Sequence, residues 1–314
     1  MHKLIKSTMS RKEELLKIPI VGTIVRILQK IKVPGLEGMS LYDVLEMYVI
    51  GIVQGALTSR AGGVAFSFFM ALFPAALFIL TLIPYVPIEG FNEIFMDFIE
   101  QALPPKTFES VDLVLIDIAN NKYGGLLSFG FILSVFLMTN GINSLFGGFE
   151  YSYHKLQTRS IIKQYVVSMV VSLILALLLF LTVGTIIYFE LAIKNLITKG
   201  YMSDDLFWIN TGRYVLTFLM IFISVGMFYY LGTKEGRKIS FFSPGAILTT
   251  LLIVVNFRIF GIYVKRFAQY NELYGSIGTL LVIMLFIWLN SIILLLGFEL
   301  NASIIRLKRE CRTE

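Results

Sequence analysis

The most constraining feature of this chain is a long uncharged run near its C-terminus. No charged residue occurs between Ile277 and Phe298, a stretch of 22 residues. As an α-helix, with a rise of about 1.5 Å per residue, this run is about 33 Å long. That length matches the ~30 Å hydrocarbon core of a bilayer. Because a water-soluble fold does not need such a run, the sequence predicts a membrane protein.

Composition extends this prediction to the whole chain. The 314 residues are 56% hydrophobic and only 15% charged, whereas soluble domains carry about 25% charged residues. The hydrophobic pattern predicts an all-α, polytopic membrane protein with six transmembrane helices. The expected spans are residues 61–84, 126–146, 165–189, 213–231, 242–264 and 277–300.

The segments outside the spans are predicted to be basic or amphipathic. A basic lead (1–39) and a basic tail (306–314) flank a transmembrane domain at 40–305. Ser40 and Asp43 form a variant of the capping box that starts a helix, and the apolar spacing after them predicts an interfacial helix before span one. Residues 88–123 carry seven acidic residues and apolar stripes, which predicts two amphipathic helices between spans one and two.

The distribution of positive charge predicts the orientation. Of the 27 Lys and Arg residues, 19 fall in segments on the same side as the N-terminus, six fall in the opposite loops and two lie within spans. Cytoplasmic segments are the basic ones, so both termini are expected in the cytoplasm. The same rule accounts for the net charge of +6. Membrane lipids are therefore the expected partners, and nucleic acid is not.

The residue types needed for a metal site or a catalytic centre are scarce. The chain has one cysteine, Cys311, and two distant histidines, His2 and His154, so a zinc site built from these ligands is not expected. The sequence contains no P-loop, nucleophile elbow or HExxH motif. We therefore expect no catalytic residues, no metal and no cofactor, and a protein that is not an enzyme.

Spans two and six resemble each other at both ends. Each follows a Tyr-Gly pair that begins at Tyr123 or Tyr274, and each ends in Gly-Phe-Glu, at 148–150 and 297–299. Some transporters are built from repeated helical units, so these spans and the ones before them could form repeated hairpins. Coincidence between two apolar segments is the alternative, and both interpretations stay open.

Several charged residues lie at the predicted cytoplasmic ends of helices. We expect an ion pair that joins Arg60 of span one to span two or span six, through Glu150 or Glu299. Such a pair would fix helix packing. A role of Glu299 in proton-coupled transport would require a desolvated carboxyl group with a raised pKa, and this alternative stays open.

Arg258 is the sharpest candidate within a span. It follows Pro244 by 14 residues, or about 21 Å along the helix, which places it in the outer third of the bilayer. It could extend to the outer interface or pair with Glu190. The functional alternative is contact with an anion or a lipid headgroup, with Asn256 nearby.

The remaining candidates are residues that bond or shape the helices. Asparagine side chains form hydrogen bonds between membrane helices, proline bends a helix, and glycine allows backbones to approach closely. The asparagines are Asn140, Asn143, Asn290 and Asn301, and the kink or close-packing residues are Pro74, Pro244, Gly275, Gly278 and Gly297.

Short motifs in a specific order resemble the YihY/virulence factor BrkB family of bacterial inner-membrane proteins. They cover roughly residues 40–305, with Gly62-Gly63 and Phe298 where the family usually has alanines. The motifs are Arg60-Ala61-Gly62-Gly63-Val64-Ala65-Phe66, Leu72-Phe73-Pro74, Asn140-Gly141-Ile142-Asn143, Pro244-Gly245-Ala246, Tyr274-Gly275-Ser276-Ile277-Gly278 and Leu296-Gly297-Phe298-Glu299-Leu300-Asn301.

The resemblance implies six transmembrane helices and a multi-pass protein of the bacterial inner membrane. Family members were once labelled ribonuclease BN, a label without chemical support in this sequence. Roles in envelope integrity and lipid movement have been proposed for relatives. The leading hypothesis is a non-enzymatic protein that transports or accommodates a lipid-like or amphipathic substrate. The alternatives are a structural protein that supports the envelope without transport and, more remotely, a membrane-embedded enzyme. The substrate, the energy source and the oligomeric state stay open.

Overall fold

The structure is a computed structural model, which describes residues 26–32, 40–43, 45–46, 49, 56–85, 96, 116–118, 120–151, 159–198, 205–234, 236, 240–267 and 271–313. Within these residues the fold is helical, apart from one isolated bridge between Lys32 and Ser40. Six helices are long and apolar enough to cross a membrane, as the sequence predicts. They are α4 (Leu57–Leu82), α7 (Gly124–Glu150), α8 (Ile161–Thr198), α9 (Asp205–Gly232), α10 (Pro244–Phe267) and α11 (Asn271–Thr313).

The helix boundaries differ from the predicted spans in ways that have local causes. α4 continues through Pro74 and is followed by a 3-10 turn, η1 (Ile83–Tyr85). α10 begins at Pro244 rather than at residue 242, because the hydroxyl of Ser243 accepts a hydrogen bond from the backbone N–H of Ala246 and caps the helix. α11 continues through the basic tail to Thr313, since no glycine or proline follows Gly297 to end it.

The predicted capping box is present. The hydroxyl of Ser40 accepts a hydrogen bond from the backbone N–H of Asp43, and the Asp43 carboxylate accepts one from the backbone N–H of Ser40 at 2.9 Å. The helix that follows is described only at 41–43, 45–46 and 49. Most of the predicted amphipathic pair at 88–123 lies outside the described residues. Placement of these helices at a membrane surface stays a prediction.

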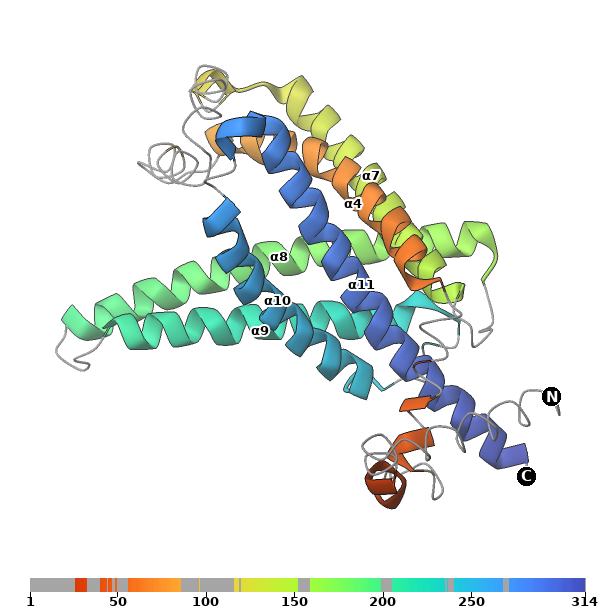
Figure 1. The fold of residues 1–314 in the computed structure, drawn as a ribbon. Coiled ribbons are helices and arrows are strands. Elements are labelled where there is room, and N and C mark those ends of the chain that lie inside the picture. The colour runs from red at the N-terminus through yellow and green to blue at the C-terminus, as the bar shows by residue number, and fades with distance from the viewer. Residues whose placement is uncertain are drawn as a thin grey trace.

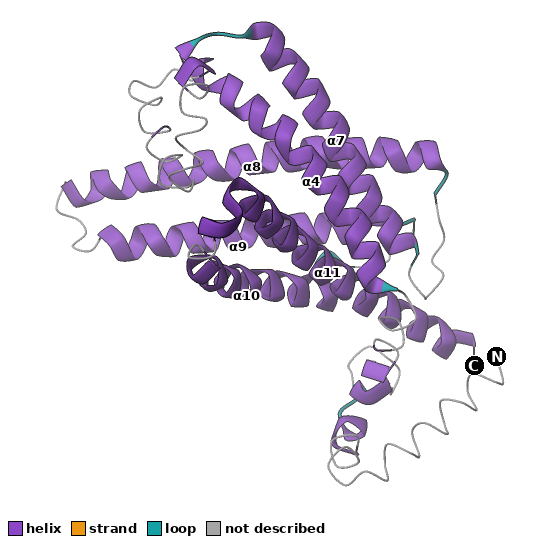
Figure 2. Cartoon of the chain, turned by 45° about the horizontal axis from the view of Figure 1, so that its top comes forward, coloured by secondary structure: helices purple, strands orange, loops and turns teal. Residues whose placement is uncertain are grey.

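The six helices form three antiparallel neighbouring pairs. α4 packs against α7, α8 against α9, and α10 against α11, while α11 also packs against α4 and α10 against α9. In two views, α8 and α9 run side by side and cross α4, α7 and α11 steeply (Figure 1 and Figure 2). We call the end that holds Arg60, Glu150, Gly232, Pro244 and Glu299 the Arg60 end. The opposite end, with Tyr85, Tyr123, Tyr188, Trp208 and Tyr263, is the Trp208 end.

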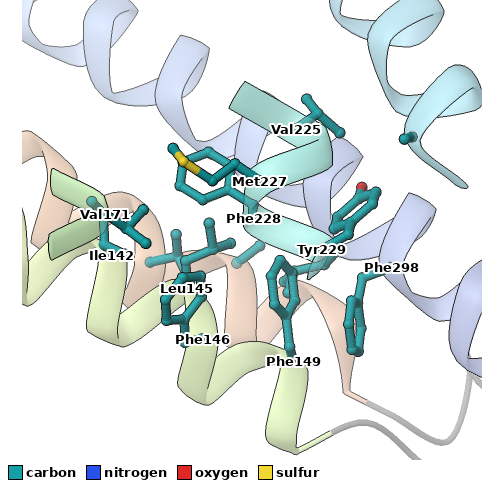
Figure 3. Close-up of a cluster of buried hydrophobic side chains, with 14 of the residues drawn as sticks. Ile142, Leu145, Phe146, Phe149, Val171, Val225, Met227, Phe228, Tyr229 and Phe298 are labelled. Carbon is teal, nitrogen blue, oxygen red and sulfur yellow. The ribbon is translucent and has the colours of Figure 1, made fainter. Parts of the chain in front are cut away.

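The buried core is concentrated at the Arg60 end. An aromatic cluster forms its centre, with residues from α7, α9 and α11 (Figure 3). Its members are Phe146, Phe149, Phe228, Tyr229 and Phe298. On α8 the described buried residues of the candidate span, from Gln164 to Ser172, all lie in the half nearer the Arg60 end, and beyond the span Ile193 is also buried. The helices are therefore packed together mainly at the Arg60 end and not evenly along their length.

Candidate functional site

The ion pair expected between the spans is present at the Arg60 end. Arg60, in the first turn of α4, donates from Nη2 to Oε1 of Glu299 on α11 at 2.6 Å. The two side chains are 9% and 0% exposed. Because both are buried, this contact differs from a surface salt bridge, whose contribution is about 0–1 kcal/mol. It connects residues 239 positions apart in the sequence.

Arg60 also reaches the third helix of this junction. Its Nη1 donates to the backbone carbonyl of Gly148 on α7 at 2.7 Å. The last four carbonyls of a helix have no partner within that helix, and Gly148 is in the last turn of α7, which ends at Glu150. One guanidinium group therefore caps α7 and pairs with α11, so that α4, α7 and α11 meet at a single side chain.

Glu150 takes a different partner from Glu299. Its Oε1 accepts the backbone N–H of Arg159 at 3.2 Å. The Arg159 guanidinium donates to the backbone carbonyls of Leu231 and, at 2.8 Å, Thr233, at the end of α9. Arg159 could not be predicted as a junction residue, because its partners are backbone carbonyls that carry no sequence signal.

The aromatic cluster packs directly beside the ion pair. Phe149 and Phe298 precede Glu150 and Glu299, and their rings stack with centroids 4.1 Å apart. The centroid of the Tyr229 ring lies 5.7 Å from that of Phe149 and 5.9 Å from that of Phe298. Figure 3 shows the three rings grouped together. The Tyr229 hydroxyl donates to the Leu294 carbonyl at 2.8 Å and is paired with the hydroxyl of Thr249. Since a phenol has one proton, Thr249 donates to Tyr229 when Tyr229 donates to Leu294.

α10 and α11 approach closely because both contact surfaces lack a side chain. A Cβ atom built on Gly245 would lie 2.1 Å from the carbonyl oxygen of Gly297, and one built on Gly297 would lie 1.8 Å from Oγ1 of Thr249. Asn301 completes the junction: its Oδ1 accepts the backbone N–H of Gly245, and its Nδ2 donates to Oγ of Ser243, both at 2.9 Å. The Asn301 amide therefore accepts a hydrogen bond from a backbone N–H in the first turn of α10, where such groups have no partner within the helix.

The other asparagines do not join this group. Among the described residues, neither Asn140 nor Asn143 makes a side-chain hydrogen bond; the polar link between α7 and α8 is instead the one between the hydroxyls of Thr139 and Ser172, at 3.2 Å. Asn290 donates to the carbonyl of Phe286 at 2.8 Å. Gly278 is buried, and Gly275 lies on α11 where side-chain surroundings are not described. Pro74 is buried within α4.

Arg258 and Asn256 are separate features. The Arg258 guanidinium lies over the ring of Tyr214 on α9, 5.0 Å from its centroid. Two residues along an α-helix rotate by about 200°, so Asn256 points away from Arg258 and its buried Nδ2 has no partner among the described residues. Asn256 is thus close to Arg258 along α10 but on a different face, and its part in a headgroup contact stays a prediction. The side chain of Glu190, the other expected partner, lies outside the described residues.

The described residues contain no group of three or more His, Cys, Asp or Glu side chains placed to hold a metal ion. The polar groups of the Arg60 end can pair, cap and orient helices. A guanidinium and a carboxylate in a buried junction can also separate if the helices around them move apart. The arrangement is thus suited to holding one conformation of a helical bundle.

Comparisons with known proteins agree with this architecture. The family model for virulence factor BrkB matches residues 51–313. A Bacillus subtilis protein named "putative ribonuclease-like protein YfkH" is 29% identical over 258 residues, 80% of this chain and 91% of its own. Two UPF0761 membrane proteins are also similar. The one from Aggregatibacter aphrophilus is 23% identical, and the match covers 82% of this chain and 90% of that protein. The one from Coxiella burnetii is 24% identical, and the match covers 76% of this chain and 84% of that protein. No solved structure matches significantly.

Proposed function

Because the chain belongs to the virulence factor BrkB family and is a multi-pass membrane protein, we propose that it is a non-enzymatic protein of the bacterial cytoplasmic membrane that accommodates or moves a lipid-like substrate. In this proposal the Arg60 end faces the cytoplasm and both termini are cytoplasmic. The substrate engages the bundle laterally, from the lipid.

One observation carries the proposal: the two ends of the bundle are built differently. At the Arg60 end, an ion pair, a stacked phenylalanine pair and a capped helix start join four helices, α4, α7, α10 and α11. Towards the Trp208 end, the described parts of α8, α9 and α10 expose large apolar side chains. Examples are Leu177, Leu181, Val215, Phe257 and Ile262. Exposed apolar faces in a membrane contact lipid tails, so a lipid-like substrate can enter there without leaving an apolar environment.

The orientation rests on charge. The Arg60 end continues into the segments that carry 19 of the 27 Lys and Arg residues. An excess of these residues is typical of the cytoplasmic side. Exposed aromatic residues at the Trp208 end, among them Tyr188, Trp208 and Tyr263, are typical of a membrane interface. The aromatic residues support an interface at this end, and the charge alone supports its placement away from the cytoplasm.

Absence of enzymatic activity is part of the proposal. One relative has a name that includes "ribonuclease-like", and hydrolysis of RNA without a metal needs acid and base groups close together. The charged groups at the Arg60 end already make structural contacts. RNA cleavage by the purified protein that is lost in His154→Ala would refute this part of the proposal.

The alternative is a structural protein that supports the envelope without transport. The buried ion pair favours it, because a pair that never opens is sufficient to hold α4, α7 and α11 together. The two proposals differ in whether the Arg60 end must open, and this difference can be measured.

The test uses a reversible cross-link across the Arg60 end. Phe149→Cys and Phe298→Cys are combined in a Cys311→Ser background, and the pair is joined with a short cleavable bifunctional thiol reagent. The protein is reconstituted in liposomes that contain a fluorescent phospholipid, and movement of that lipid between leaflets is followed by quenching. We expect movement above that of protein-free liposomes, a loss on cross-linking and a recovery on reduction. Each single-cysteine variant with the same reagent is the control. Absence of movement by the unmodified protein would favour the structural alternative, and movement unaffected by the cross-link would refute opening at this end.

A further inference from the structure

The Trp208 end contains a charged group in an unusual position. Arg258 on α10 is exposed, and its guanidinium lies over the ring of Tyr214 on α9, 5.0 Å from the centroid. Among the described residues it forms no ion pair, whereas Arg60 is paired with Glu299. The two arginines therefore have different surroundings, and Arg258 has no packing role of the kind that explains Arg60.

The depth of this pair follows from the helix ends. The candidate span of α10 ends at Val264, and that of α9 begins at Trp208. Arg258 is six residues before the first and Tyr214 six residues after the second, so both lie about 9 Å inside the span. With the candidate spans as the membrane-crossing parts of the helices, this position is expected near the outer edge of the hydrocarbon, from which a long side chain can reach the headgroup layer.

The exposed face around Arg258 continues as an apolar track. Leu251, Val255 and Ile262 stand at positions i−7, i−3 and i+4 from Arg258, which places them on the same face of α10, and each is about half exposed or more. Leu251 and Val255 lie on the side of Arg258 that leads to the middle of the membrane. Phe218 of α9, one turn from Tyr214, is exposed too. A cation is thus followed, in the direction of the bilayer centre, by apolar side chains.

This order of charge and apolar surface is complementary to a phospholipid. We propose that Arg258 and Tyr214 bind the phosphate group of a membrane phospholipid whose acyl chain lies along Leu251 and Val255. The Tyr214 ring holds one face of the guanidinium, which leaves the N–H groups at its edge free to bind phosphate oxygens as a fork. The inference rests on the proposed function, since the orientation proposed there decides in which leaflet this lipid lies. It adds that the recognised part of the substrate is a phosphate headgroup.

The test measures lipid binding and not movement. The full-length protein in detergent is titrated with phosphatidylglycerol, and separately with diacylglycerol of the same acyl chains, and native mass spectrometry measures the bound fraction. We expect the wild type to prefer phosphatidylglycerol. Arg258→Gln should weaken phosphatidylglycerol binding about tenfold, the range of a hydrogen bond to a charged group, and should leave diacylglycerol binding unchanged. Arg258→Lys should retain part of the preference, and Tyr214→Leu should reduce it.

Lys122→Gln is the matched control, because Lys122 also lies over a tyrosine ring, that of Tyr85 at 5.4 Å, but outside the spans. It should bind phosphatidylglycerol as the wild type does. Variants are compared only if they are monodisperse and melt like the wild type, and Arg258→Lys keeps the test decisive if Arg258→Gln does not fold. Equal binding by Arg258→Gln and the wild type would overturn the inference. Displacement of the lipid by millimolar inorganic phosphate would also overturn it, since the site would then bind a soluble anion. Failure of lipid movement in liposomes with this preference intact would refute the proposed function and not this site.

Discussion

Removal of Arg60 is expected to destabilise the protein more than neutralisation of Glu299. Glu299 is fully buried, whereas Arg60 retains 9% exposure. Arg60→Met leaves a carboxylate without its cation and leaves the Gly148 carbonyl without its donor. Breaking one side of a buried pair costs about 3–5 kcal/mol. Glu299→Gln keeps an oxygen that can accept from Arg60, so the remaining hydrogen bond limits the cost to about 1–3 kcal/mol.

A double-mutant cycle separates the pair from its surroundings. Arg60→Met combined with Glu299→Leu removes both charges, and replacement of a buried pair by apolar residues is often neutral. The double variant should therefore be more stable than Arg60→Met alone. Thermal and denaturant unfolding in detergent can be followed by the fluorescence of Trp208 and Trp288. The exposed Lys163 provides the control Lys163→Met, which should change stability by less than about 0.5 kcal/mol.

Two results would refute this reasoning. If Arg60→Met and Glu299→Gln both lie within about 0.5 kcal/mol of the wild type, the pair contributes no more than a surface contact. If the double variant loses the sum of the losses measured for Arg60→Met alone and Glu299→Leu alone, the residues are not coupled. In either case the ion pair would not be the element that holds the Arg60 end together.

Three further predictions address packing, capping and orientation. Gly297→Ala should lower the free energy of unfolding by about 1–3 kcal/mol, because its Cβ would meet Thr249 and Tyr229. Gly62→Ala has open space around it and should leave stability unchanged or raise it. Unfolding of both variants in detergent measures the difference. Asn301→Ala should cost about 1–2 kcal/mol through loss of the α10 cap, and Asn143→Ala should cost less, as the same assay would show. In spheroplasts, a membrane-impermeant maleimide should label Lys122→Cys in a Cys311→Ser background but should not label the native Cys311; labelling of Cys311 would reverse the orientation.

The sequence was sufficient to predict the elements that depend on local composition. The six apolar helices follow from runs of uncharged residues long enough to span a bilayer, and the Ser40–Asp43 capping box follows from two polar residues at fixed spacing. The partner of Arg60 was predicted only as a choice between Glu150 and Glu299. Both carboxylates end similar motifs on helices that both pack against α4, so the choice of Glu299 is visible only in the three-dimensional arrangement, in which Glu150 accepts the backbone N–H of Arg159.

Contacts that involve the backbone, or helices far apart in the sequence, could not be predicted. Arg159 binds the carbonyls of Leu231 and Thr233, and a carbonyl is present at every position of a sequence. The contact between Arg258 and Tyr214 depends on how α9 crosses α10. The separation of Asn256 from Arg258, by contrast, follows from helical geometry alone, because residues two positions apart lie on opposite faces.

The Gly-Phe-Glu motifs show how similar sequences come to serve different purposes. Phe149 and Phe298 stack on each other, so the two motifs lie at the same level of the bundle, which is compatible with repeated hairpins. The glycines before them differ: Gly148 offers its carbonyl to Arg60, whereas Gly297 lets α10 approach. The carboxylates also differ, since Glu299 is buried against a guanidinium and Glu150 accepts a backbone N–H of the next segment. If the hairpins arose by duplication, one copy became the charged contact of the Arg60 end and the other the start of the loop that caps α9. A change in Glu299 is therefore expected to act on the whole junction, and the same change in Glu150 on one connection.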